Sequence, residues 1–214
     1  PDGKAIIFVN YRDSAERVQT ALRKAGIHAG LYHGALEQQE RELAVAMLNN
    51  GSTPIVVSTD LASRGLDIDA VDYVIHYHMP ATAETWTHRN GRTARQGADG
   101  SVYVITSEND TVPDYVETDR PYVPTGNSSD PIRPHTFTLY FNLGKKEKIS
   151  RGDIAGFIAK AGGIAGNAIG AINVSDHSSI AAVDTGEASA QALAKTLSEQ
   201  RLKGKKVRVS VVSR

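Results

Sequence analysis

Short apolar runs alternate with amphipathic stretches over the first hundred residues, and this alternation constrains the fold more than any other feature. It predicts buried strands at Ala5–Asn10, Ile55–Ser58, Tyr73–Tyr77 and Ser101–Thr106, with a weaker strand near His28–Tyr32. It predicts helices at Asp13–Ala25, Leu36–Leu48 and Glu84–Arg95. Such an order implies an α/β fold with a parallel sheet covered on both faces, and functional loops at the carboxyl ends of the strands.

A second pattern begins near residue 135. It predicts strands at His135–Asn142, Ile169–Val174, Ser178–Val183 and Lys206–Val212, and helices at Arg151–Ala161 and Glu187–Glu199. The order βαββαβ predicts a small α+β domain in which two helices cover one face of a four-stranded antiparallel sheet. Residues 108–134 are acidic and rich in proline, as is typical of an extended linker. The expected domains are therefore 1–107 and 135–214, joined by 108–134.

The charge is unevenly distributed, although the whole chain is neutral. Residues 1–107 carry 10 Lys and Arg against 12 Asp and Glu, whereas residues 131–214 carry 13 against 6. A basic second domain favours a polyanionic partner. The absence of cysteine excludes disulfides, thiolate metal sites and a cysteine nucleophile. No apolar run approaches the ~20 residues that cross a membrane, so we expect no membrane association and a cytoplasmic location.

The segment HRNGRTARQG, residues 88–97, carries the most distinctive chemistry. Arg89, Arg92 and Arg95 recur every three residues and would lie along one side of a single helix. Guanidinium groups match phosphate oxygens bidentately, as the stabilisation of a transferring phosphoryl group requires. Taken alone, such a row is also typical of a solvated basic helix face.

Two further segments follow predicted strands. STDLASRGLDI, residues 58–68, offers hydroxyl, backbone N–H and guanidinium donors that suit a sugar–phosphate backbone, and a carboxylate that suits a ribose hydroxyl. HGALEQQER, residues 33–41, places Gln38 and Arg41 on the first turns of a helix. Taken singly, helix capping and an exposed polar face explain these residues equally well.

In this order, the segments IIFVN, HG–Q–R, STDLASRGLDI and HRNGRTARQG closely resemble the second RecA-like lobe of DEAD-box RNA helicases. The resemblance covers residues 5–107. Two positions depart from the usual pattern: Asn90 stands where an aliphatic residue is common, and Ala94 where glycine is common.

The resemblance implies a role for each matching residue. Arg92 and Arg95 correspond to arginine fingers that reach the ATP γ-phosphate, and His88 to a residue that couples nucleotide state to the other lobe. Arg89 would hold the motif in place. Asp67 corresponds to a contact with the ATP ribose, and Gly65 lies in the same nucleotide-binding segment. The implied contacts to the RNA backbone are Asn10, Gly34, Gln38, Arg41, Thr59, Asp60 and Arg64.

The sequence contains neither a G-x-x-x-x-G-K-[ST] loop nor a D-E-A-D box. The residues that cradle the phosphates of ATP and hold its Mg²⁺ are therefore expected on a first RecA-like lobe outside this sequence. We expect the chain to be part of a longer protein, with that lobe as a partner, and to hydrolyse no ATP alone. His28, His76 and His78 lack partners at ligand spacing, so no metal site is expected in this chain.

The second domain has the element order of an RNA-recognition motif. Tyr140 would occupy the place of a stacking aromatic, whereas the third strand has none. Recognition must therefore depend on charge. The expected contacts are Lys145, Lys146, Lys148 and Arg151 before the first helix, and Lys203, Lys205, Lys206 and Arg208 near the last strand. A solvated lysine-rich loop is the alternative interpretation.

The segments GKKEKISRGDIAGFI, IGAINV and RLKGKKVRVSVV resemble the C-terminal RNA-binding domain of DbpA-like helicases. That resemblance implies binding to structured RNA, with ribosomal RNA and ribosome biogenesis as the expected setting. Two functions stay open. The first is an ATP-dependent RNA helicase represented by its second lobe and an anchoring domain. The second is a non-catalytic RNA-binding adaptor or a cold-shock RNA chaperone, which would have no need of arginine fingers.

Overall fold

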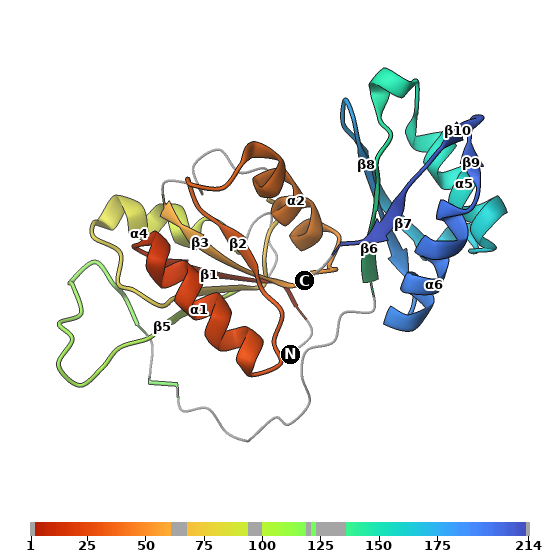
Figure 1. The fold of residues 1–214 in the computed structure, drawn as a ribbon. Coiled ribbons are helices and arrows are strands. Elements are labelled where there is room, and N and C mark those ends of the chain that lie inside the picture. Colours follow the sequence, from red (N-terminus) through yellow and green to blue (C-terminus); the bar gives the residue numbers. More distant parts are fainter. Residues whose placement is uncertain (1–2, 61–67, 94–99, 119–120, 123–135, 213–214) are drawn as a thin grey trace. The chain divides into compact units, whose positions relative to one another are not determined.

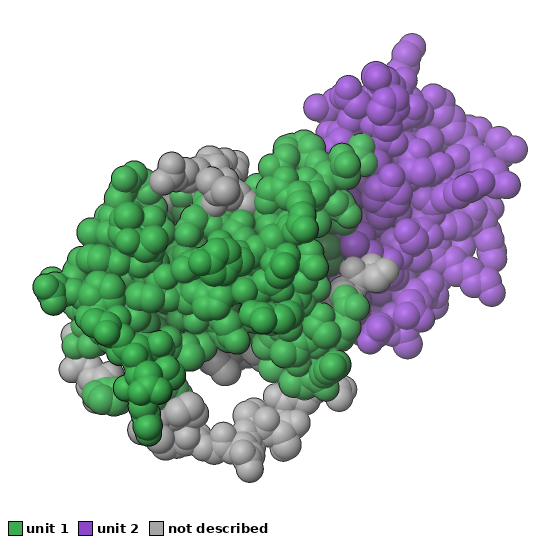
Figure 2. Space-filling model, turned by 60° about the vertical axis from the view of Figure 1, so that its left-hand side comes forward, with its two compact units in different colours: residues 1–49, 53–133 green, residues 50–52, 134–214 purple. Residues whose placement is uncertain are grey.

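The computed structural model describes residues 3–60, 68–93, 100–118, 121–122 and 136–212. The chain forms two compact units, one of residues 1–49 with 53–133 and the other of residues 50–52 with 134–214 (Figure 2). Each unit has a sheet and helices of its own (Figure 1). The two units are described separately below.

The first unit contains a five-stranded parallel sheet in the order β2-β3-β1-β4-β5 (Figure 1). Its strands are β1 (Ala5–Val9), β2 (Gly30–Tyr32), β3 (Ile55–Thr59), β4 (Tyr73–His76) and β5 (Ser101–Val104). The predicted strands and their parallel arrangement are confirmed. Val9 pairs with Thr59, and Phe8 pairs with His76, so β1, β3 and β4 end side by side.

Helices cover both faces of this sheet. They are α1 (Arg12–Lys24), α2 (Gln38–Asn49) and α4 (Ala83–Asn90). Alternate residues of β1 face opposite sides: Ile7 belongs to a buried cluster with Val18 of α1, and Phe8 to one with Leu48 of α2. Because β1 is apolar on both sides, it reads as a continuous hydrophobic run in the sequence.

The second unit contains a four-stranded antiparallel sheet in the order β11-β6-β8-β7, with the βαββαβ order that the sequence predicts. Its elements are β6 (Thr136–Phe141), α5 (Arg151–Gly162), β7 (Ile169–Val174), β8 (Ser179–Asp184), α6 (Glu187–Ser198) and β11 (Val209–Val211). Leu139 and Phe141 are fully buried against the helices, whereas Tyr140 lies on the other face and is 38% exposed, as the alternation of a strand requires.

The chain ahead of β11 differs from the prediction. A strand was expected from Lys206 onward, but a two-stranded hairpin of β9 (Arg201–Leu202) and β10 (Lys205–Lys206) precedes β11. Two short 3₁₀ helices, Lys145–Glu147 and Gly166–Ala168, complete the unit.

Part of the expected linker packs on the first unit. The hydroxyl of Tyr115 donates a hydrogen bond to the carbonyl of Pro80 at 2.7 Å, and Val116 is only 6% exposed. The expected linker is therefore held against the first unit at Tyr115 and Val116. Among the helices that the structure describes, none has the length and apolar character needed to cross a membrane.

Candidate nucleotide and RNA site

A buried arginine lies at the centre of the candidate site in the first unit. Arg89 is 1% exposed, and all five of its N–H donors have an acceptor. Nε and Nη2 donate to the two carboxylate oxygens of Asp60 at 2.6 and 2.7 Å, and Nη2 also donates to Asn10 Oδ1 at 2.8 Å. Nη1 donates to the carbonyl of His78 at 2.8 Å and lies 3.3 Å from His76 Nδ1. We call these five residues the Arg89 cluster.

The Arg89 cluster joins the carboxyl ends of three adjacent strands. Asn10 follows β1, Asp60 follows β3, and His76 ends β4, while Arg89 itself belongs to α4. Asn10 is held at both ends, because its Nδ2 donates to the carbonyl of Met79 at 3.0 Å. Three motifs that lie far apart in the sequence are thereby fixed to one guanidinium group. This geometry agrees with the role that the resemblance implies for Arg89.

His76 is the member of the Arg89 cluster that lies in strand β4. Its side chain is fully buried, and its ring lies 4.6 Å from the ring of Trp86. Nε2 lies 2.8 Å from Asn90 Oδ1, which can only accept, so Nε2 carries the proton and Nδ1 is free to accept from Arg89. The pKa of His76 is lowered to about 4, mainly because the ring is buried and partly because of the nearby charge of Arg89, while the hydrogen bond to Asn90 and the charge of Asp60 oppose the shift. The imidazole is therefore neutral at pH 7.

The expectation that three arginines line one helix is wrong for the described part of the segment. Helix α4 ends at Asn90, with Gly91 as its C-cap, so Arg92 lies beyond the helix. Arg89 has an acidic partner and is buried, and it does not face an open cleft. Asp60, the acid that neutralises Arg89, lies 29 residues away in the sequence. The three-residue repeat alone therefore could not indicate that Arg89 is buried and paired.

Of the predicted nucleotide-binding residues, the structure describes Arg92. Its backbone is fixed at both polar groups: its N–H donates to the carbonyl of Arg89 at 3.1 Å, and its carbonyl accepts from Val71 N at 3.0 Å. The residue is half-buried. His88 is more open, with 54% of its side chain exposed and Nδ1 3.8 Å from Glu84. Arg64, Gly65, Asp67 and Arg95 lie outside the described residues.

The predicted RNA-contact residues of the first unit follow β2 and β3. Thr59 ends β3 and is 7% exposed, whereas Gly34 lies in an exposed turn after β2 with open space around its α-carbon. On the first turn of α2, Arg41 Nη2 donates to Gln38 Oε1 at 2.9 Å. Arg41 Nε and His33 Nδ1 are buried, and neither has a hydrogen-bond partner among the described residues.

The basic residues of the second unit form two neighbouring surface segments. One follows β6, and the other is the β9–β10 hairpin. Lys203 Nζ donates to the carbonyl of Lys148 at 2.9 Å, and Lys205 Nζ donates to the carbonyl of Glu147 at 3.0 Å. The structure thus brings together the two lysine groups that the sequence predicts as RNA contacts. Arg208 lies on the approach to β11, where its N–H donates to Asn142 Oδ1 at 2.7 Å.

Sequence reasoning missed the functional pairing of His76 with Asn90. His76 was interpreted as a core or surface histidine rather than a metal ligand, and Asn90 was noted only as a departure from the aliphatic residue common there; the structure places His76 in the core. The sequence did contain a signal for this pair: His76 is a polar residue in a predicted buried strand, and Asn90 is a polar residue where an aliphatic one is common. Among the described residues, the structure contains no group of three or more His, Asp or Glu side chains able to hold a metal ion.

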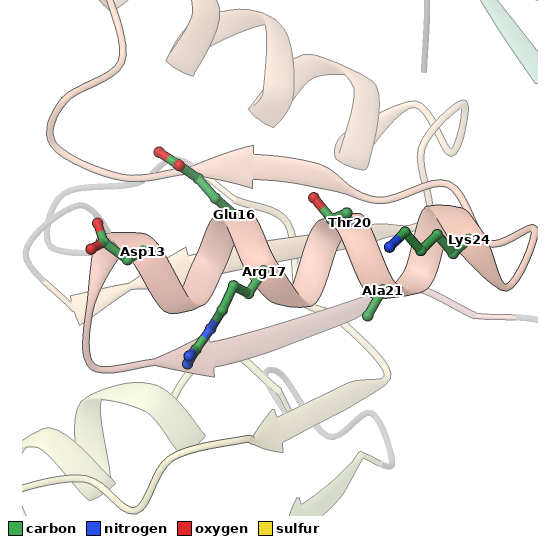
Figure 3. Close-up of a pocket in the computed structure, with 6 residues that line it drawn as sticks. All are labelled: Asp13, Glu16, Arg17, Thr20, Ala21 and Lys24. Atoms are coloured by element: carbon green, nitrogen blue, oxygen red, sulfur yellow. The ribbon is translucent and has the colours of Figure 1, made fainter.

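An open depression of about 640 Å³ lies elsewhere, along the outer side of α1 (Figure 3). Its described lining is Asp13, Glu16, Arg17, Thr20, Ala21 and Lys24. Glu16 and Arg17 leave the helix on opposite sides (Figure 3). This lining carries both signs of charge on one helix, and it includes none of the predicted site residues.

The comparisons with known proteins agree with both units. Residues 1–97 match the family described as helicase conserved C-terminal domain, and residues 138–211 match the DbpA RNA binding domain. The first unit is thus similar to helicase C-terminal domains, and the second is similar to DbpA RNA-binding domains. The relatives described below are ATP-dependent RNA helicases, DEAD-box proteins among them. The resemblance that the motifs indicate is confirmed.

Curated relatives match about half of this chain. The probable ATP-dependent RNA helicase ddx17 of Dictyostelium discoideum is 41% identical over 109 residues, which are 50% of this chain and 14% of the relative. DEAD-box ATP-dependent RNA helicase 5 of Oryza sativa subsp. japonica is 42% identical over 107 residues, 50% of this chain and 21% of the relative. The chain thus spans about a fifth or less of these relatives.

Solved structures are also similar to about half of this chain. The E. coli DEAD-box protein SrmB, solved bound to the regulator of ribonuclease activity A, is 37% identical, with a TM-score of 0.46 over 47% of this chain and 59% of that chain. A DEAD box protein from Methanococcus jannaschii is 32% identical, with a TM-score of 0.46 over 48% of this chain and 28% of that chain.

Proposed function

We propose that this chain is the second RecA-like lobe and the RNA-anchoring domain of a cytoplasmic, ATP-dependent RNA helicase. The complete enzyme would close two lobes on ATP and RNA, melt base pairs locally, and reset when ATP is hydrolysed. The Arg89 cluster is the observation that carries this proposal. It ties the strand ends that carry Asn10 and Asp60, two of the proposed RNA contacts, to Arg89, whose carbonyl accepts from the N–H of Arg92, the proposed arginine finger; both proposed sites would therefore depend on one framework.

The nucleotide side of the proposal depends on Arg92. Its guanidinium stands on a backbone held by Arg89 and Val71, as a group that must meet a terminal phosphate requires. A positioned arginine stabilises the charge that develops on a transferring phosphoryl group, and it contributes about 10³-fold or more to the rate. ATP would supply that phosphoryl group, and Arg95, Asp67 and Gly65 would complete the contacts. The other lobe would hold the Mg²⁺.

The RNA side of the proposal combines two surfaces. In the first unit, the segments at Gly34–Arg41 and Thr59–Asp60 would contact the sugar–phosphate backbone. Arg41 Nε and His33 Nδ1, which are buried and have no hydrogen-bond partner in the described part of the chain, support the first of these segments, because an RNA oxygen or hydroxyl would supply a partner. Backbone contacts carry little sequence information. The DbpA-type domain would therefore choose the RNA, and we propose structured ribosomal RNA during ribosome biogenesis as the target.

The test joins the first lobe of a DEAD-box relative to the amino end of this chain and measures ATP hydrolysis with and without structured RNA. We expect no turnover by the chain alone and RNA-stimulated turnover by the joined protein. Arg92→Ala should remove that turnover. Arg23→Ala, at an exposed position of α1, is the control and should leave it unchanged. A joined protein that binds both RNA and ATP but never hydrolyses ATP would instead support the non-catalytic adaptor.

A further inference from the structure

The sheet of the second unit offers little for stacking of RNA bases. Tyr140 is the exposed aromatic of β6, and its register partners are Ile180 of β8 and Ser210 of β11. Aromatic side chains supply the stacking platforms on which single-stranded bases bind. This face therefore provides a platform for one base. The main contacts with RNA must lie elsewhere on the unit.

The two basic segments beside the sheet are locked together by lysine-to-carbonyl hydrogen bonds. Lys203 and Lys205, from the β9–β10 hairpin, donate to the consecutive carbonyls of Lys148 and Glu147. Lys203 Nζ also lies 3.1 Å from Asp153 Oδ2 on the first turn of α5. We call this arrangement the lysine clasp. Two of the basic side chains that the sequence predicts as RNA contacts are thus engaged within the protein.

The backbone on both sides of the clasp is in an uncommon conformation. Lys148 has φ 61° and Lys203 has φ 50°, and these are the non-glycine residues with positive φ in the described chain. Local turns require them: Lys148 is the left-handed C-cap of the 3₁₀ helix Lys145–Glu147, and Lys203 and Gly204 form the two-residue loop of the β9–β10 hairpin. Gly144 adds a further constraint, because a β-carbon there would lie 2.3 Å from the carbonyl of Ser175. The segment from Gly144 to Ile149 is therefore held in one shape.

The carboxylates of this segment are already used by the protein. Glu147 Oε2 accepts from Gly144 N at 2.8 Å, and Asp153 Oδ2 accepts from both the N–H and the hydroxyl of Ser150. The two hydrogen bonds from Ser150, together with that from Lys203, hold the pKa of Asp153 below its ordinary value. By contrast, the side chains of Lys145, Lys148 and Arg151 are exposed, and no hydrogen bond or ion pair within the described chain engages them.

We propose that the lysine clasp fixes the Gly144–Ile149 segment as a preformed surface for RNA phosphates, with Lys145, Lys148 and Arg151 as contacts and Lys203 as a positioning residue. The inference deepens the proposed RNA-anchoring function and rests on it. Preformed cations bind phosphates without the entropic cost of ordering a loop. The surface recognises the sugar–phosphate backbone of folded RNA, and Tyr140 adds stacking for one base.

The test measures binding of the full chain to a fluorescein-labelled RNA hairpin over a range of salt concentrations. Lys148→Gln should weaken binding about three- to fivefold. It should also reduce the slope of log affinity against log salt by about 0.7–0.9, since one phosphate contact is lost. Lys203→Asn removes the two Lys203 hydrogen bonds of the clasp, leaves that of Lys205, and keeps a residue that tolerates positive φ. Lys206→Gln is the matched control, because it removes a charge from the same hairpin without touching the clasp.

A double-mutant cycle separates positioning from direct contact. If Lys203 positions Lys148, then Lys148→Gln should cost less in the Lys203→Asn background than in the unmodified chain, whereas it should cost the same in the Lys206→Gln background. Hydrogen exchange of the Lys148 and Ile149 amides, which bond to Lys145 and Gly144, should accelerate only in Lys203→Asn, with the amides of β6 as reference.

Additive losses for Lys148 and Lys203 with unchanged exchange would overturn the inference while leaving RNA binding intact. A larger loss for Tyr140→Ala than for Lys145→Gln and Lys148→Gln together would overturn it in favour of the sheet. An unmodified chain that does not bind the hairpin would remove the proposed anchoring function itself, and this inference with it. In that case the exchange measurement would still report whether the clasp orders the segment.

Discussion

Replacement of Asp60 by Asn should destabilise the first unit strongly, although the side chain keeps its shape. Asp60 supplies two of the five acceptors of Arg89 and the only carboxylate within hydrogen-bond distance of it among the described residues. At 1% exposure, the guanidinium cannot exchange this partner for water. An uncompensated buried charge costs about 3–5 kcal/mol, and we expect Asp60→Asn to lower the free energy of unfolding by that amount.

Trp86 makes this measurement specific to the first unit. It is the single tryptophan of the chain, and its ring packs on His76 within the site. Its fluorescence in a urea titration therefore follows the first unit even if the second unfolds separately. Asp69→Asn is the control, because its side chain is exposed, and it should stay within about 0.5 kcal/mol. An Asp60→Asn protein as stable as this control would refute the account of Arg89 as a buried, charge-paired centre.

Two further measurements follow from the structure. The folded-state pKa of His76 is depressed to about 4, so the unfolded chain binds a proton below pH 6.5 that the folded chain does not. The stability of the first unit, followed by Trp86 fluorescence, should be complete above pH 6.5 and fall by about 3 kcal/mol as the pH drops to 4. His76→Gln should flatten the pH dependence of stability. An unchanged pH profile in this variant would contradict the assignment of that dependence to His76. In the second unit, Gly144→Ala should cost about 1–3 kcal/mol, because the added carbon would overlap the carbonyl of Ser175, whereas Gly166→Ala faces open space. Thermal unfolding by circular dichroism would compare these two variants, and equal stability would contradict the close approach at Gly144.

The strands of the first unit were predictable because a parallel sheet buried on both faces leaves uninterrupted apolar runs in the sequence. All five lie within about two residues of their expected positions. Helix ends were less predictable. The Arg89–Arg92 spacing suits a helix, but α4 ends at Asn90, and a three-residue arginine repeat carries no information about that end. The β9–β10 hairpin was missed for a similar reason, since positive φ at Lys203 is rare for lysine.

The roles of basic residues could not be assigned from local sequence, because each role depends on a partner that is remote in the chain. Arg89 and Arg92 belong to one motif and have the same side chain. Arg89 is buried because Asp60 and Asn10 reach it from two other strand ends, and Arg92 stands beyond the helix on the backbone that Arg89 holds.

Lys203 and Lys148 show the same division in the second unit. Lys203 donates to a carbonyl 55 residues away, whereas the Lys148 side chain points into solvent with no partner among the described residues. In both units, one cation holds the framework, Arg89 in the first and Lys203 in the second, and we propose its neighbour, Arg92 or Lys148, as the phosphate contact. A cation that is buried or bonded to the protein backbone has spent its donors, whereas Lys148 is exposed on a backbone fixed in this way and keeps its donors for a ligand. This argument separates positioning residues from ligand contacts in a motif where composition and spacing treat them alike.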